Sequence, residues 1–258
     1  MLKPEEGNVL KLKSLNPTIG LKMPKAVVFD LDNTLYPYEK AHQTAIAAVC
    51  DTCCHQVGLS KAAFWDYLQA AKDQIKCQLG TQASSHSRLL YFQRLLELVG
   101  LKSQPEMALQ LEGLYWQVYI QHMTLFDGVE LFLQQMRHRN IPLACVTDLT
   151  AQIQMRKLMA LECDRAFDWL VTSEEAGSDK KDLKPFYCLG EKLRLSTSDT
   201  LWMIGDSPVD ALIKSVFPQA QVFACTISAP IFKGADFAFD DYHVLQALMS
   251  EQSSSITV

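Results

Sequence analysis

The sequence predicts an α/β protein with a Rossmann-like, three-layer core built on a parallel sheet, into which an all-helical domain is inserted. Two observations carry this prediction. From residue 126 onwards, short apolar segments typical of buried strands alternate with amphipathic helical segments. One further strand-like segment, at 25–31, is separated from the others by a long stretch that has helical spacing only. Strand–helix alternation is typical of a parallel sheet with helices on both faces.

Each predicted strand is a short apolar run, and the first of them ends in an acid. Residues 25–31 have the sequence KAVVFDL, the pattern of a strand that is buried on both faces. The other predicted strands are 142–147, 168–172, 200–205, 220–226 and 236–239. The predicted helices among them are 128–139, 150–160, 185–194, 208–216 and 241–250.

The inserted domain is predicted from apolar residues that recur at helical spacing. The segments are 39–57, 60–78, 86–99 and 104–122. Ser60 is a typical N-cap for the second segment, and Gly80 and Gly100 mark the ends of the second and third. The chain then divides into an N-terminal extension at 1–24, expected to be disordered, a core domain formed by 25–37 and 126–250, and the helical domain at 38–125.

Composition and charge exclude several classes of protein. The 258 residues are 48% hydrophobic and 21% charged, with 24 basic and 29 acidic residues and a net charge of −5. The densest basic run is the short one at 180–184, so binding to a nucleic acid polymer is not expected. Neither a signal-peptide core nor a run of 18 apolar residues occurs, so we expect a cytoplasmic protein without a membrane-spanning helix.

Three of the eight cysteines lie close together, at Cys50, Cys53 and Cys54. This cluster invites a metal-site interpretation, but it has no second ligand pair at the spacing of a zinc site. The three residues share one face of a predicted helix. We therefore expect buried, reduced thiols rather than a metal site.

Acidic and hydroxyl side chains follow three predicted strands, at the edge where parallel sheets bind ligands. They are Asp30 and Asp32, Thr147 and Asp148, and Asp206 and Asp210. Asp30 and Asp32 are two residues apart, so on an extended chain they face the same way. Like charges gathered at this density need a cation. A bound phosphate would add repulsion of roughly 4 kcal/mol per charge pair at 4 Å and an effective dielectric constant near 20, which a divalent cation and a lysine would offset.

In their order along the chain, these motifs resemble those of the haloacid dehalogenase-like (HAD) hydrolase superfamily. The motifs are DLDNTL, VTD, a lysine-rich segment and GDSPVD, and the helical insertion is similar to the cap of the helical-cap subfamily. The start DLDNTLYPY and the segment from VTDLTAQIQMRKL to VTSEEAG are similar to the branch that contains pyrimidine 5′-nucleotidases and sugar-phosphate phosphatases. The resemblance implies phosphate transfer with Mg²⁺ as the cofactor.

The resemblance also implies roles for the four aspartates. Asp30 would be the nucleophile and a magnesium ligand. Asp32 would be the general acid and base, with its backbone carbonyl on the metal. Asp206 would bind magnesium, and Asp210 would support that ligand or bind the metal itself.

The phosphate-binding residues follow in the same way. Thr147 and the backbone amide of Asp148 would bind the phosphate, together with a lysine from the third motif. Lys184 precedes a proline, as the family lysine usually does, whereas the ungapped match of SEEAGSDKKDLKPF to the family pattern selects Lys180. We favour Lys180 and keep Lys184 as the alternative.

Substrate choice is expected to lie in the cap. His86 and Arg88, in a polar stretch between two predicted helices, are the candidates for binding a second anionic group of the substrate. The alternative is that Ser85 caps the following helix and both side chains are solvated. Tyr36 either lines the entrance or packs at the hinge of the cap.

The function expected from these residues is Mg²⁺-dependent hydrolysis of a small phosphorylated metabolite, of the nucleotide or sugar phosphate class, through an aspartyl-phosphate intermediate. Asp32 favours phosphate transfer over dehalogenation, because dehalogenases of the superfamily lack this second aspartate. The alternatives are a phosphomutase of the same fold, or an interaction or scaffold protein with weak catalysis.

Overall fold

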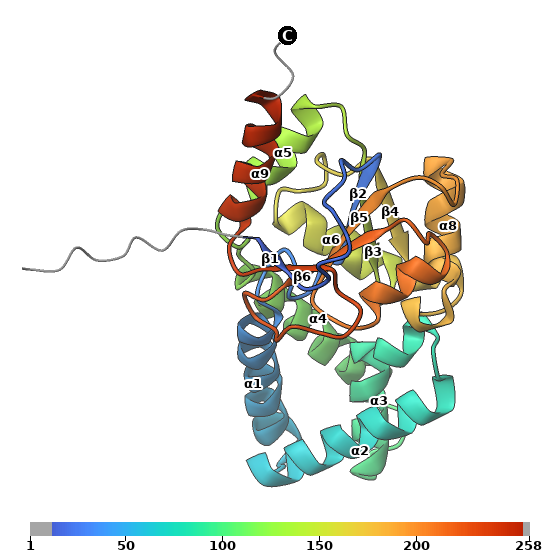
Figure 1. The fold of residues 1–258 in the computed structure, drawn as a ribbon. Helices are drawn as coiled ribbons and strands as arrows, with labels where there is room; N and C mark the ends of the chain where they lie inside the picture. The colour runs from blue at the N-terminus through green and yellow to red at the C-terminus, as the bar shows by residue number, and fades with distance from the viewer. Residues whose placement is uncertain (1–11, 255–258) are drawn as a thin grey trace, which may run out of the picture.

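A seven-stranded sheet forms the centre of the molecule in a computed structural model that describes residues 12–254 (Figure 1). Its strands are β1 (Lys13–Ser14), β2 (Ala26–Phe29), β3 (Leu143–Thr147), β4 (Trp169–Thr172), β5 (Leu201–Gly205), β6 (Gln221–Cys225) and β7 (Phe237–Phe239). Their order is β1-β7-β6-β5-β2-β3-β4, and every neighbouring pair is parallel except β1 with β7. Because β2 lies between β5 and β3, the carboxyl ends of these three strands adjoin one another.

Helices cover both faces of this sheet, as the alternating side chains of β2 require. Val27 and Phe29 join an apolar core with the helices of one face, and Ala26 and Val28 join a second core on the other face. The first face carries α5 (Val129–His138), α6 (Ala151–Ala160) and α9 (Tyr242–Ser254). The second carries α8 (Lys184–Leu193) and the 3-10 helix η3 (Asp210–Ser215). The predicted three-layer α/β core is confirmed.

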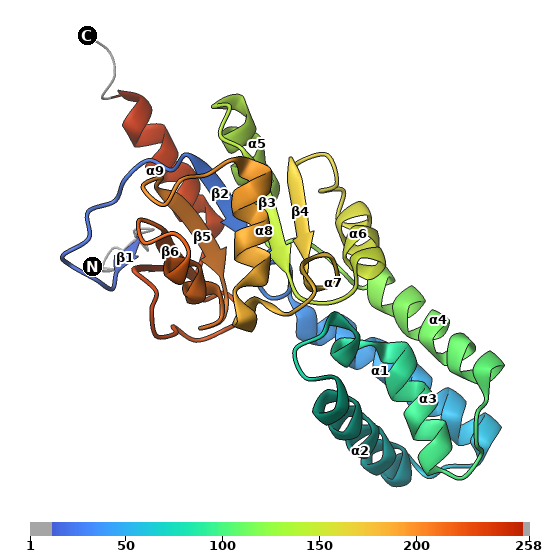
Figure 2. The same ribbon diagram turned by 90° about the vertical axis from the view of Figure 1, so that its right-hand side faces the viewer.

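The predicted helical insertion between β2 and β3 is also confirmed, and it lies beside the sheet as a separate group of helices (Figure 2). It contains α1 (Tyr38–Val57), α2 (Lys61–Leu79), the 3-10 helix η1 (Ala83–His86), α3 (Arg88–Leu98) and α4 (Pro105–Gln121). The Ser60 side chain caps α2 by accepting a hydrogen bond from the backbone N–H of Ala63. Cys50 and Cys53 are buried in the apolar core of this insertion, as expected, whereas Cys54 is only partly buried because it lies at the margin of that core.

Four short elements differ from the predictions. The helix predicted at 208–216 is only the 3-10 helix η3, and α7 (Ser173–Ala176) and η2 (Lys180–Asp182) were not predicted. The disorder expected at 1–24 is wrong for β1, which pairs with β7, while 1–11 lie outside the described residues. Elements this short have no periodicity for a sequence analysis to detect.

Within 12–254, no helix is both long enough and apolar enough to cross a membrane.

Candidate active site

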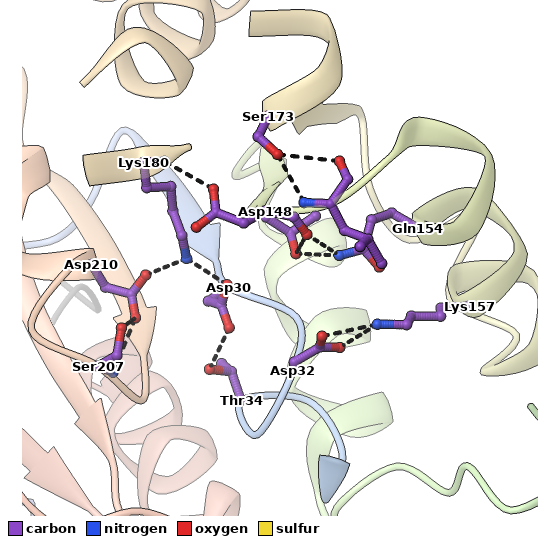
Figure 3. Close-up of polar contacts among 12 residues, drawn as sticks. Asp30, Asp32, Thr34, Asp148, Gln154, Lys157, Ser173, Lys180, Ser207 and Asp210 are labelled. Atoms are coloured by element: carbon purple, nitrogen blue, oxygen red, sulfur yellow. Dashed lines mark hydrogen bonds and ion pairs between the residues drawn. The ribbon is translucent and has the colours of Figure 1, made fainter. Parts of the chain in front are cut away.

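Asp30 is the first residue after β2, at the junction of the three central strands. Its backbone N–H donates to the carbonyl of Ile204 on β5 over 2.9 Å, which continues the sheet by one residue. Its carboxylate is 6% exposed, and Oδ1 accepts a hydrogen bond of 2.6 Å from Lys180 Nζ (Figure 3). Thr34 Oγ1 lies 3.4 Å from the other oxygen. The carboxylate is thus fixed at the base of a cavity of about 320 Å³.

Asp32 lines the same cavity, but its carboxylate is held by a different lysine. Lys157 Nζ on α6 lies 2.8 Å from Oδ1 and 2.9 Å from Oδ2. Figure 3 shows the two aspartates next to each other, with Lys157 and Lys180 on opposite sides. The two carboxylates therefore share the cavity and keep separate partners.

Three carboxylates meet at the carboxyl ends of β2 and β5. One oxygen each from Asp30, Asp206 and Asp210 lies within 4.8 Å of the others. Lys180 Nζ bridges two of them, at 2.6 Å from both Asp30 Oδ1 and Asp210 Oδ1. Lys184, the alternative lysine, is exposed at the first position of α8. The structure therefore brings Lys180, and not Lys184, to the carboxylates.

Gly205 explains how Asp210 can approach the end of β5 so closely. A Cβ atom at this position would lie 2.2 Å from Asp210 Oδ2, a distance that real Cβ contacts do not show. The same carboxylate oxygen accepts hydrogen bonds from the backbone N–H of Ser207 (3.1 Å) and from its hydroxyl (3.2 Å). The glycine of the GDSPVD motif thus makes room for the second aspartate of that motif.

Burial and mutual repulsion dominate the electrostatics of this cluster. Burial raises the pKa of Asp30, with Lys180 acting in the opposite direction, and burial together with the charge of Asp210 raises the pKa of Asp206 to about 6. Burial lowers the pKa of Lys180, but the attraction of Asp210 and Asp30 outweighs it, so the net shift is upward. One ammonium facing three carboxylates leaves an excess of negative charge. Carboxylate oxygens with such an excess, two buried and one half-buried, are the ligand set that Mg²⁺ and Ca²⁺ prefer, so the cluster fits a divalent cation.

Thr147 and Asp148 lie at the end of β3, on the other side of Asp30. Gln154 Nε2, on α6, donates to Thr147 Oγ1 (2.7 Å) and to the backbone carbonyl of Asp148 (2.6 Å). The Thr147 hydroxyl itself donates a long bond of 3.4 Å to the Asp148 carbonyl, and this proton can be redirected to a phosphate in the cavity. Asp148 Oδ1 accepts from the backbone N–H of Lys180 (2.8 Å), which ties this loop to the lysine segment.

Sequence reasoning missed Lys157, which is 1% exposed. Its ammonium lies 5.9, 5.7 and 5.4 Å from the ring centroids of Tyr36, Trp116 and Tyr119. Burial lowers its pKa, whereas the charge of Asp32 acts to raise it. The available signal was a lysine on the apolar face of the helix predicted at 150–160. No signal in the sequence identified its partner.

The cap residues His86 and Arg88 line the active-site cavity, together with Tyr38. His86 Nε2 lies 2.9 Å from Asp179 Oδ2, and Arg88 donates to the Tyr38 hydroxyl over 2.8 Å. Neither side chain is fully exposed. The residue that caps α3 is Ser87, not Ser85.

Tyr36 does not lie at the entrance of the active-site cavity. It is fully buried and does not line the active-site cavity. Its hydroxyl hydrogen-bonds Asp32 and lies 2.7 Å from the Tyr119 hydroxyl on α4. Packing at the hinge between core and cap, the second sequence-based interpretation, describes this position.

The protein is therefore an α/β protein with buried aspartates at the carboxyl edge of its parallel sheet. It also has a helical insertion after the first parallel strand. Comparison with known proteins identifies the family. The haloacid dehalogenase-like hydrolase family profile matches residues 27–213. The chain belongs to this family. It is a HAD-type phosphatase, a phosphoric monoester hydrolase, as its relatives are.

Three similar proteins illustrate this relationship. A ribulose-1,5-bisphosphate 5-phosphatase of Halopiger xanaduensis is 35% identical over 186 residues, covering 71% of this chain and 77% of that protein. A glyceraldehyde 3-phosphate phosphatase of Methanopyrus kandleri is 28% identical over 188 residues, covering 71% and 76%. A magnesium-bound HAD-hydrolase from Bacillus subtilis shares the fold with a TM-score of 0.62 and 17% identity, over 89% of this chain and all of its own.

Proposed function

We propose that this protein is a Mg²⁺-dependent phosphatase of small sugar phosphates that works through an aspartyl-phosphate intermediate. The observation that carries the proposal is the buried contact of Asp30 with Lys180 beside Asp206 and Asp210, at the base of a cavity. A nucleophile, a cation for the phosphate oxygens and a ligand set for a metal are then available at one point.

The proposed chemistry has two steps. In the first, an oxygen of Asp30 bonds to phosphorus, the bond to the leaving-group oxygen breaks, and Asp32 gives its proton to that oxygen. In the second, Asp32 takes a proton from water, whose oxygen attacks phosphorus and releases Asp30 with inorganic phosphate. Thr147, the backbone amide of Asp148 and Lys180 hold the phosphate oxygens in both steps.

A divalent cation on Asp30, Asp206 and Asp210 would offset the repulsion between the carboxylates and the phosphate. Mg²⁺ is the proposed ion, because it prefers carboxylate oxygens together with the oxygens of a phosphate substrate. The backbone carbonyl of Asp32 is a further proposed ligand.

The substrate class is proposed from the relatives and from the size of the cavity. Two relatives are named for activity on ribulose 1,5-bisphosphate and glyceraldehyde 3-phosphate. A cavity of about 320 Å³ is large enough for a phosphorylated sugar of a few carbons. We therefore favour sugar phosphates over nucleotides.

The test is phosphate release from p-nitrophenyl phosphate and a panel of sugar phosphates and nucleotides, with Mg²⁺ or with EDTA. We expect release that requires Mg²⁺, favours a sugar phosphate and is lost in Asp30→Asn. Release that is unchanged in Asp30→Asn would contradict the mechanism. Conversion of a sugar phosphate into its isomer, followed by ³¹P NMR, would identify a mutase, and no reaction with any ester would leave only the interaction or scaffold role.

A further inference from the structure

We propose that the cap holds a second anion-binding site, formed by Lys72, Lys76 and Arg88, and that the substrate is a phosphomonoester with a second anionic group. This inference rests on the proposed phosphatase function, because the first phosphate must occupy the site at Asp30. The second group is a phosphate or a carboxylate, since both are anions that lysine and arginine bind through charge-assisted hydrogen bonds.

The first observation is a second cavity, which adjoins the active-site cavity and shares lining residues with it. It has a volume of about 280 Å³ and lies between α1, α2 and α3 of the cap. Tyr38, His86 and Arg88 line both cavities. The proposal requires that a molecule whose phosphate binds near Asp30 extends past these three residues into the cap.

The second observation is the charge of this cavity. Lys72 and Lys76 lie one helical turn apart on α2, and both line the cavity with Arg88. No aspartate or glutamate lines it. Within residues 12–254, neither lysine forms an ion pair with a carboxylate, whereas Lys61 on the same helix pairs with Asp51.

The effect of these charges extends to neighbouring groups. Lys76 is exposed as a residue, but partial burial of its ammonium lowers its pKa, and the charges of Lys72 and Arg88 lower it further. The charges of Asp73 and Asp179 act to raise this pKa. Burial also lowers the pKa of His42, to about 4, with the same two cations acting in that direction. Like charges one helical turn apart destabilise a helix, so an anion bound between them would relieve a repulsion already present.

The third observation is the fixed position of Arg88. Its guanidinium donates to the Tyr38 hydroxyl (2.8 Å) and to the His86 carbonyl (2.7 Å). It also lies within 5.7 Å of the ring centroids of Tyr91, Tyr115 and Trp116. Arg88 is therefore held at the junction of the two cavities, where it can bind an anion without losing much conformational freedom.

The rest of the wall is partly apolar and partly polar. Ile46, Leu68 and Phe92 line the cavity, as does Trp65, which is 43% exposed. His42, Gln69 and Tyr91 of the same wall can form hydrogen bonds. The three cations are what suits this cavity to an anionic end of the substrate.

The experiment measures binding without turnover. In the Asp30→Asn protein with Mg²⁺, isothermal titration calorimetry compares ribulose 1,5-bisphosphate with ribulose 5-phosphate, and 6-phosphogluconate with glucose 6-phosphate. We expect the ligand with the second anionic group to have a Kd lower by about tenfold or more in at least one pair. The pair that shows this difference identifies the second group as a phosphate or a carboxylate. Lys72→Met and Lys76→Met should each remove most of that gain and change the Kd of the mono-anionic ligand less than twofold.

Lys61→Met is the matched control, because Lys61 is on the same helix and does not line the cavity. It should leave every Kd unchanged. Equal affinity for both members of each pair, or equal losses for mono- and bis-anionic ligands in the lysine variants, would overturn the inference. Turnover of p-nitrophenyl phosphate by Lys61→Met, with Asp30 intact, should match the wild type. Selective binding without turnover of any ester would overturn the proposed function and leave the anion site standing.

Discussion

At the scale of single residues, the side chain of Asp32 depends on a partner from a distant part of the chain. Lys157 holds both of its oxygens, and Tyr36 contacts one of them. The lysine is itself enclosed by rings of the cap, among them Trp116 and Tyr119. Lys157 is therefore a positioning residue for the proposed general acid and base, and it links that residue to the cap.

Lys157→Met is expected to lower kcat by about 10- to 100-fold with little change in KM, because Asp32 loses the bonds that orient it towards the leaving group. Asp32 is 31% exposed at its side chain, so water can replace the lysine and the fold should survive. Steady-state kinetics and thermal unfolding test this together. The matched control is Arg156→Met, an exposed neighbour on α6, which should retain normal kcat. A parallel loss of kcat and of folded protein would assign Lys157 a structural role only.

At the scale of elements, the turn after β5 is shaped by one missing side chain. Gly205 ends the strand, and Asp210 begins η3 with its carboxylate against the glycine. The carboxylate is then held by Ser207 and Lys180. The strand end and the short helix form one unit that fixes the ligand set of the proposed metal.

Gly205→Ala is expected to displace Asp210, because the new methyl group would lie 2.2 Å from its carboxylate. Overpacking of this kind lowers the free energy of unfolding by about 1–3 kcal/mol, and a misplaced carboxylate should lower kcat by about 100-fold or more. Chemical denaturation and phosphate release measure the two effects.

Gly113→Ala serves as the control within a helix. Gly113 lies in α4 with nothing within 4 Å of an added Cβ. That variant should gain about 0.5–1 kcal/mol in free energy of unfolding, because alanine favours the helix more than glycine does, and it should keep full activity. Full activity of Gly205→Ala would contradict the role of the close contact.

At the scale of the whole molecule, the carboxylate cluster makes stability depend on pH and on bound cations. Burial and Asp210 raise the pKa of Asp206 to about 6, whereas an aspartate in the unfolded chain has a pKa of about 3.9. The folded protein therefore binds more protons than the unfolded chain between these values. Its stability must fall as the pH rises through this window.

For the protein stripped of metal with EDTA, we expect the free energy of unfolding to fall by on the order of 1–3 kcal/mol between pH 4 and pH 6.5. Mg²⁺ at pH 7 should raise Tm, because it binds the ionised carboxylates of the folded state. Denaturant titrations across this pH range provide the measurement. Asp206→Asn should flatten the decline, while Asp66→Asn, an exposed residue on α2, should leave it unchanged. Stability that rises over the same window would refute this account.

The sequence by itself predicted most of the fold, because β2 and β3 are unbroken apolar runs and the helices of the insertion carry their periodicity in consecutive residues. It also predicted which residues follow the strands. Asp30, Asp206 and Asp210 were therefore expected at one edge of the sheet. These predictions depend on local patterns and on the rule that parallel strands end together.

Only the tertiary structure decided which side chains meet within the site. It paired Lys157 with Asp32, brought Lys180 rather than Lys184 to the carboxylates, and placed Arg88 in the wall of both the active-site cavity and the cap cavity. Such pairs come from segments far apart in the chain. Their distances depend on how helices and loops pack, and neighbouring residues in the sequence carry no record of that packing.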